Sequence, residues 1–147
     1  MSGTNGIVLY VEDEESDRFL MWKAFKKEGL DTALHMVSDG RLAVDYLSGA
    51  GAYADRQAHL EPGVVLLDLN LPEIHGFDVL KWIRADPRHS TLPVVVFTSS
   101  DRDEDSQRAK LLGANEFWPK PHSVTGLQEV ARRLGERWLN TGQAKMQ

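Results

Sequence analysis

The feature that most restricts how this chain can fold is a regular alternation of short apolar runs with longer segments of helical periodicity. The runs are rich in β-branched residues, as strands buried on both faces of a parallel sheet usually are. We predict strands at residues 7–11, 32–37, 64–69, 93–98 and 115–118. Five strands separated by helices predict the α/β class, with one five-stranded parallel sheet covered by helices on both faces.

The segments between the apolar runs carry signals for the start and end of helices. Asp39 and Ser123 are of the residue types that cap a helix N-terminus, and Gly29 and Gly113 stand where glycine often follows a helix. The predicted helices cover 15–28, 41–47, 76–86, 102–112 and 124–140. The 147 residues fit one domain, which we place at 6–140, with flexible ends at 1–5 and 141–147 and one long loop at 48–63.

The composition excludes several classes of protein. Asp and Glu (22) outnumber Lys and Arg (17), and the resulting charge of −5 gives no reason to expect nucleic acid as a partner. The absence of cysteine excludes disulfides, thiol catalysis and thiolate metal sites. No run approaches the roughly 20 apolar residues that span a bilayer, and the run at 7–11 is too short for a signal peptide. We therefore expect a cytoplasmic protein without a membrane partner.

Polar residues follow four of the predicted strands. Residues 12–14 (Glu-Asp-Glu) follow the first strand, Asp68 ends the third, residues 98–100 (Thr-Ser-Ser) end the fourth, and Lys120 follows the fifth. Because ligands of open parallel sheets bind at the carboxyl ends of strands, we expect these side chains to meet. Carboxylates without His or Cys suit a hard cation such as Mg²⁺ or Mn²⁺. A carboxylate nucleophile, a hard metal, a lysine and a hydroxyl are the parts needed to transfer a phosphoryl group to an aspartate.

These strand ends also carry recognisable motifs: VEDE at 11–14, LLDLNLPEIHG at 66–76, VFTSS at 96–100 and PKP at 119–121. A chain with these four motifs in this order resembles the receiver domain of two-component response regulators, of the CheY-like type. The resemblance covers about residues 6–137. It implies a flavodoxin-like fold with strand order 2-1-3-4-5.

The resemblance also implies roles for the acidic residues and their neighbours. Asp68 resembles the phosphoacceptor of the family, and Asp13 resembles the direct Mg²⁺ ligand. Glu12 would act on the metal through water, and the backbone carbonyl of Asn70 would be a further ligand. Asp68 would itself also contact the metal.

The remaining site residues would hold the phosphoryl group and report its presence. Thr98, the backbone N–H of Ser99, and Lys120 resemble the groups that bind phosphoryl oxygens. Phe117 falls at the position of the family's aromatic switch, three residues before the lysine. The resemblance further implies a cis Lys120–Pro121 peptide bond, a conformation essentially confined to proline.

The implied function is that of a single-domain response regulator, which accepts a phosphoryl group from a sensor histidine kinase. Such a protein assists its own phosphorylation and dephosphorylation but is not a conventional turnover enzyme. The segments VEDEESDRFL and LLDLNLPEIHGFDVL and the 48–63 loop resemble stand-alone regulators paired with phytochrome-type kinases.

Signal output would need a protein–protein surface, and we hypothesise a homodimer through the face formed by the fourth helix, the fifth strand and the last helix. Apolar side chains at this face would provide the contact, because exposed apolar patches mark interaction sites. The residues expected there are Lys110, Leu111, Phe117, Trp118, Leu127, Val130, Leu134 and Trp138.

Other interpretations stay open at this point. An aspartyl-phosphate phosphatase of the haloacid-dehalogenase type would need an acid where this chain has Asn70, and a phosphate-independent receiver-like module would usually lack some of the site residues. Glu12 and Asp13 could simply cap the first helix. Thr98 could be a plain strand residue and Phe117 a plain core aromatic. The five histidines show no ligand spacing, and we interpret them as incidental.

Overall fold

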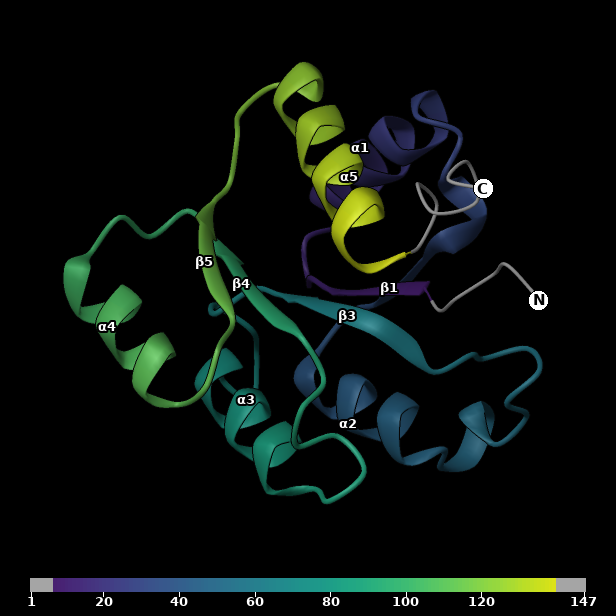
Figure 1. Ribbon diagram of the computed structural model, residues 1–147, viewed down its shortest axis with the longest axis vertical. Helices are drawn as coiled ribbons and strands as arrows, with labels where there is room; N and C mark the ends of the chain where they lie inside the picture. The colour runs from purple at the N-terminus through teal and green to yellow at the C-terminus, as the bar shows by residue number, and fades with distance from the viewer. Residues whose placement is uncertain (1–6, 140–147) are drawn as a thin grey trace.

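The apolar runs form one parallel sheet, which the computed structural model describes within residues 7–139. The predicted domain limits at 6 and 140 and the predicted flexible ends lie outside the described residues. The strand order is β2-β1-β3-β4-β5, as the resemblance implies (Figure 1). The strands are β1 (Ile7–Val11), β2 (Leu34–Val37), β3 (Pro62–Leu67), β4 (Val94–Thr98) and β5 (Glu116–Pro119).

Helices connect the strands, and the predicted caps are confirmed. The Asp39 side chain accepts a hydrogen bond from the Leu42 N–H (2.8 Å), and the Ser123 hydroxyl accepts one from the Gly126 N–H (3.0 Å). Within the described residues the helices are α1 (Glu15–Lys27), α2 (Gly40–Ser48), α3 (Gly76–Ala85), α4 (Asp103–Leu111) and α5 (Val124–Trp138). None of them is long and apolar enough to cross a bilayer.

The element boundaries differ from the prediction by one or two residues at several places. β2 begins at Leu34 instead of residue 32, because Asp31–Ala33 form a short 3₁₀ turn. β5 extends through Pro119, which lies on the edge of the sheet, where the missing N–H costs no ladder bond. Asp68 lies one residue beyond β3 and not inside it, so the acid begins the loop at the edge of the sheet.

Two separate cores cover the two faces of the sheet. Successive strand residues point to opposite faces, so Val8 and Tyr10 pack with α1 and α5, whereas Leu9 and Val11 pack with α2 and α3. Figure 1 shows α1 and α5 on one side of the sheet and α2 and α3 on the other. This double cover explains why β1, in the middle of the sheet, is apolar at every position.

The predicted long loop is held in place by charged side chains. Arg56 donates to the carbonyls of Tyr46 (2.7 Å) and Tyr53 (2.9 Å) and pairs with Glu61 (3.1 Å). His89 is buried, with Nδ1 2.7 Å from Asp86 Oδ2 and Nε2 3.0 Å from Glu61 Oε1. His89 therefore has a structural role, in which it ties the loop before β3 to the end of α3.

Most of the apolar side chains expected at a dimer interface cover the core. Trp118, Leu127, Val130 and Leu134 are buried and pack against the α1 side of the sheet. Trp138 is half-buried against the same core, with its ring 6.2 Å from that of Trp118. These four side chains therefore expose little surface in this conformation, and their place in an interface stays a prediction. Of the expected residues, Leu111 on α4 is 86% exposed, and the dimer itself stays a prediction.

Candidate functional site

Parallel pairing brings the polar strand ends to one edge of the sheet. Ladder-like bonds continue just beyond the strands: the Glu12 N–H donates to the Val37 carbonyl (3.1 Å) and the Asp68 N–H donates to the Val11 carbonyl (3.2 Å). The Lys120 N–H likewise donates to the Thr98 carbonyl (3.0 Å). The backbone of each of these three residues is therefore fixed by a neighbouring strand, and the side chains start from defined positions.

Three carboxylates from two of these ends form a cluster. Glu12, Asp13 and Asp68 each place one carboxylate oxygen within 4.8 Å of the others. Glu12 is fully buried and Asp68 is 4% exposed, whereas Asp13 is half-buried. Like charges held this closely repel one another unless a cation compensates them. A cluster of oxygen donors alone fits a hard divalent cation, so the donor set agrees with the predicted metal site.

Lys120 lies against the same cluster. Its Nζ is 2.6 Å from Glu12 Oε1, 3.2 Å from Asp17 Oδ2 and 3.4 Å from Asp68 Oδ2. Burial disfavours the charged form of Lys120, but the hydrogen bond with Glu12 and the charges of Asp68 and Glu12 outweigh it and raise the lysine pKa above its usual value. The side chain is therefore a fixed positive charge beside Asp68.

Glu12 is tied into the site by more groups than the sequence predicts. The Tyr10 hydroxyl donates to Glu12 Oε1 (3.1 Å), and the Glu14 N–H donates to Oε2 (3.2 Å). Arg18 donates to the Glu12 carbonyl (2.7 Å). Burial raises the pKa of Glu12, the bond from Lys120 opposes this rise, and the charge of Asp68 adds to it. Glu12 is thus a buried, hydrogen-bonded acid and not a solvated helix cap.

Tyr10 and Asp17 contact residues of the candidate site, and the sequence interpretation missed both. Tyr10 looks like an ordinary member of an apolar strand, and only its register directs the hydroxyl towards Glu12. Asp17 is one of several acids around the start of α1. It lies in the first turn of α1, and nothing in its sequence position signals the contact with Lys120.

Thr98 and Ser99 end β4 next to this cluster. Thr98 is fully buried and its Oγ1 accepts a bond from the Ser100 N–H (3.3 Å), so its own hydroxyl proton is still available for an acceptor. Ser99 is exposed. Asn70, in the loop after Asp68, donates its N–H to Asp68 Oδ1 (3.4 Å). Their roles in binding phosphoryl or metal stay predictions.

The loop between β3 and α3 is packed closely against the acidic residue. A Cβ atom added at Gly76 would lie 2.4 Å from the Asp68 carbonyl oxygen and 2.6 Å from the Leu69 Cα, distances that no side chain can occupy. Glycine is required here by this close approach of two backbone segments. The end of α3 nearest the site is therefore held directly against Asp68.

Two further expectations concern the residues near Lys120. The predicted cis Lys120–Pro121 bond is wrong, because no peptide bond among the described residues is cis. The energy difference between cis and trans before proline is small, and Lys120 reaches Glu12 and Asp68 from a trans bond. Phe117 is half-buried against the core on the α3 side of the sheet. It pairs in register with Val96 of β4, whose side chain belongs to the same core. Its role as a switch stays a prediction.

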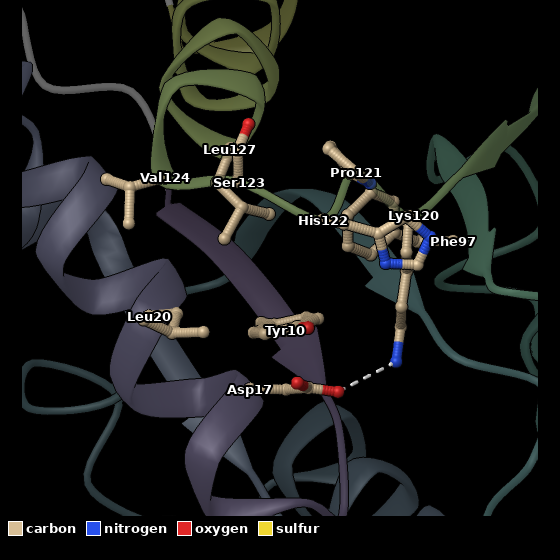
Figure 2. A pocket seen from close by; sticks show the side chains of 10 residues that line it. All are labelled: Tyr10, Asp17, Leu20, Phe97, Lys120, Pro121, His122, Ser123, Val124 and Leu127. Atoms are coloured by element: carbon tan, nitrogen blue, oxygen red, sulfur yellow. Dashed lines mark hydrogen bonds and ion pairs between the residues drawn. The ribbon is translucent and has the colours of Figure 1, made fainter.

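A cavity of about 350 Å³ opens beside Lys120, between α1 and the start of α5. Figure 2 shows Asp17 and Lys120 directed towards each other at its edge, with the ion pair drawn between them. Leu20 of α1 and Val124 and Leu127 of α5 supply apolar wall. The cavity is thus bounded by one charged pair of the site, by side chains of α1 and α5, by Tyr10 and Phe97 of the sheet, and by the β5–α5 connection.

Comparison with known proteins places this arrangement in a family. The sequence profile of the response regulator receiver domain matches residues 8–132. The chain belongs to this family. Receiver domains are the response-regulator part of two-component signalling systems, and the fold and motifs described above agree with this membership.

The relatives of this receiver domain include stand-alone phytochrome response regulators. Rcp1 from Synechocystis sp. is 31% identical over 135 residues, covering 92% of this chain and 90% of Rcp1. The structure of phosphorylated RcpA, a cyanobacterial phytochrome response regulator, has a TM-score of 0.80 at 30% identity, covering 91% of this chain and 94% of RcpA. RPA3017, a response regulator in red light signaling of R. palustris, has a TM-score of 0.84 at 32% identity, covering 92% of this chain and 95% of RPA3017.

One of these relatives has also been solved with a metal. The Mn²⁺-bound form of Rcp1 has a TM-score of 0.77 to this chain at 31% identity, covering 92% of this chain and 96% of Rcp1. The predicted similarity to receiver domains, and to the phytochrome-associated regulators among them, is confirmed by these matches.

Proposed function

We propose that this receiver domain accepts a phosphoryl group on Asp68 from a sensor histidine kinase, with Mg²⁺ as the cofactor. The observation that carries the proposal is the position of Asp68, which lies 3.4 Å from a fixed lysine ammonium group and beside two further carboxylates. This arrangement provides a nucleophile, a positive charge for the transferred group and an oxygen-lined place for a hard cation. The phosphorylated state of RcpA and the metal-bound state of Rcp1 support it by similarity.

In the transfer step, an oxygen of the Asp68 carboxylate attacks the phosphorus of a phosphohistidine. The N–P bond breaks, its electron pair leaves with the imidazole, and the imidazole takes up a proton. Lys120, whose Nζ is 3.4 Å from Asp68 Oδ2, would pair with a phosphoryl oxygen. The Thr98 hydroxyl and the Ser99 N–H would donate to others.

A bound Mg²⁺ or Mn²⁺ ion would supply positive charge to the phosphoryl oxygens. Asp13, Asp68 and the Asn70 carbonyl would hold it directly, with Glu12 acting through water. Reversal of the signal needs attack by water on the phosphorus, which breaks the P–O bond and returns the Asp68 carboxylate and inorganic phosphate. The protein would thus assist its own modification without being a conventional enzyme.

The kinase partner proposed here is of the bacteriophytochrome type. The motifs of the chain and its similarity to RcpA and RPA3017 support this choice. Signalling would proceed through a protein–protein surface that depends on phosphorylation, with a homodimer through α4, β5 and α5 as one form of it. Sedimentation with and without a phosphoryl mimic tests the dimer, and a mass of one chain at every concentration in both states would exclude it.

The central experiment is incubation with a small-molecule phosphodonor and Mg²⁺, followed by intact mass measurement. We expect a single added phosphoryl group on the wild type and none on Asp68→Asn. Asp78→Asn, which removes an exposed acid from α3, is the matched control and should react as the wild type does. No addition with any donor would favour a phosphate-independent binding module, and continuous release of phosphate from many monoesters would favour a phosphatase.

A further inference from the structure

The ammonium group of Lys120 has no free donor in this structure. An ammonium group carries three N–H donors and no acceptor. Its three acceptors are Glu12 Oε1 (2.6 Å), Asp17 Oδ2 (3.2 Å) and Asp68 Oδ2 (3.4 Å). These acceptors come from three elements: the end of β1, helix α1 and the end of β3. If Asp68 takes a phosphoryl group, as proposed above, a phosphoryl oxygen can bond to Lys120 only when one present partner is displaced.

The three partners differ in how easily they can be displaced. Glu12 is fully buried and has the shortest contact with Lys120 (2.6 Å), so losing the lysine would leave a buried carboxylate without a direct cationic partner. Asp68 loses its carboxylate charge when it is modified, and in its place stands a phosphoryl group of higher negative charge, which competes with the other two acceptors for Lys120. The Asp17 side chain is 38% exposed, and water can replace the lysine as its partner.

We propose that Asp17 is the releasable partner of Lys120, which pairs with the amine while Asp68 is unmodified and gives it up when Asp68 carries a phosphoryl group. Asp17 would be a positioning residue, because it acts through Lys120 and does not touch the reacting atoms. The inference rests on the proposed phosphorylation of Asp68. It adds a residue of α1 to the set that responds to phosphorylation.

The position of the pair gives its release a structural consequence. Asp17 and Lys120 stand at the edge of the 350 Å³ cavity between α1 and the start of α5 (Figure 2). Their ion pair is a polar tie across this edge, joining α1 to the β5–α5 connection. When Lys120 turns to the phosphoryl group, this tie is lost and the Asp17 carboxylate becomes free to face solvent. The state of Asp68 would then be readable at the cavity between the two helices.

The variant Asp17→Asn tests the competition between Asp17 and the phosphoryl group. Without the Asp17 carboxylate, Lys120 gives up no ion pair with it on binding the phosphoryl group. The free energy of the modified state should therefore fall relative to that of the unmodified state. An exposed ion pair is worth about 0.2–1 kcal/mol, which converts to about 1.5- to 5-fold in an equilibrium constant. We expect beryllofluoride, a stable mimic of the acyl phosphate, to bind Asp17→Asn more tightly by this factor in the presence of Mg²⁺.

Glu15→Gln is the matched control, because it removes one exposed negative charge from the same first turn of α1. We expect its affinity for beryllofluoride to stay within the error of the wild type. Thermal unfolding checks that both variants are folded, and Asp17→Ala should repeat the effect of Asp17→Asn. Equal affinity of Asp17→Asn and Glu15→Gln, or weaker binding by Asp17→Asn, would overturn the inference while leaving phosphorylation of Asp68 intact.

NMR of the side chains supplies a direct measurement that needs no phosphoryl transfer. In the metal-free protein, Asp17→Asn should shift the Lys120 ammonium and Cε resonances, and Glu15→Gln should leave them in place. In the wild type, saturation with beryllofluoride should move the Asp17 carboxyl ¹³C resonance towards that of a solvated aspartate. An Asp17 resonance that stays unchanged would refute the release. A wild type that takes up neither beryllofluoride nor phosphoryl would refute the proposed function, and the inference with it.

Discussion

Replacing Asp68 by asparagine should stabilise the metal-free protein, although it removes the proposed phosphoacceptor. Without a cation, the Asp68 carboxylate is repelled by Glu12 and Asp13 and attracted by Lys120. Asparagine keeps the shape of the side chain and one oxygen for the Asn70 N–H. The substitution therefore isolates the effect of the charge.

The distances give the size of the expected gain. With an effective dielectric constant of about 20, unit charges at 4.8 Å, the upper limit of the separations among the three carboxylates, repel by about 3.5 kcal/mol, and charges 3.4 Å apart attract by about 4.9 kcal/mol. The repulsions from Glu12 and Asp13 and the attraction by Lys120 sum to a net interaction energy of the Asp68 charge that is unfavourable by about 2 kcal/mol. Solvent at the half-buried Asp13 weakens its share, so we expect a gain of about 1–2 kcal/mol. For a chain of this size this corresponds to about 3–8 °C in Tm.

Thermal unfolding in EDTA measures the effect of the charge repulsion, and unfolding in Mg²⁺ measures the stabilisation by the bound ion. In EDTA, Asp68→Asn should melt above the wild type. At a Mg²⁺ concentration about 100 times Kd, binding adds about 2.7 kcal/mol to the wild type, whereas the variant, with one ligand charge removed, gains far less. The order of the two melting temperatures should then reverse.

The exposed acid Asp78 provides the control for net charge, and Asp78→Asn should follow the wild type in both buffers. Two results would refute the reasoning. One is an Asp68→Asn variant that is no more stable than the wild type in EDTA. The other is an equal gain from Mg²⁺ in both proteins, which would place the cation away from the acidic cluster.

Three further substitutions test single contacts by unfolding measurements. Gly76→Ala should destabilise the fold by about 1–3 kcal/mol and weaken Mg²⁺ binding, because its Cβ would displace the backbone of the β3–α3 loop; unchanged stability would contradict the close approach. Tyr10→Phe should cost about 1–2 kcal/mol, since it removes the buried hydroxyl that donates to Glu12. The hydrogen bond from Arg137 lowers the pKa of Glu116 below its ordinary 4.5. Glu116→Gln should therefore lower the free energy of unfolding by a constant amount above pH 4.5. This difference should vanish as the pH falls through the lower pKa of the folded state.

The parts of the fold that the sequence predicts are those set by local pattern. Strand runs, helix caps and the identity of the polar residue at each strand end can be read along the chain, because each depends on neighbours within a few positions. Asp39, Ser123 and Asp68 illustrate this, as their places in caps and at the strand end follow from adjacent residues. The strand order followed from resemblance and not from pattern, since parallel strands with apolar faces give no local sign of their neighbours.

The parts that the sequence could not predict depend on packing between distant segments. Five acids stand at residues 12–15 and 17, and nothing in their spacing says which of them pairs with a lysine more than a hundred residues later. The phase of α1 against the β5–α5 connection makes that choice. The same reason applies to His89, whose partner Glu61 is 28 residues away, and to the burial of Trp118, whose ring lies 6.2 Å from that of Trp138 on α5.

The hydrogen bonds that Glu12 already accepts limit how much a bound metal can contribute to folding. Within residues 7–139, no buried side-chain nitrogen or oxygen lacks a hydrogen-bond partner. Glu12, the most buried acid of the cluster, already accepts bonds from Tyr10, Glu14 and Lys120. The two apolar cores lie on either face of the sheet and use none of these groups except Tyr10. We therefore expect the protein to fold in EDTA, and a divalent ion to change the charge balance at the strand ends while leaving both cores as they are.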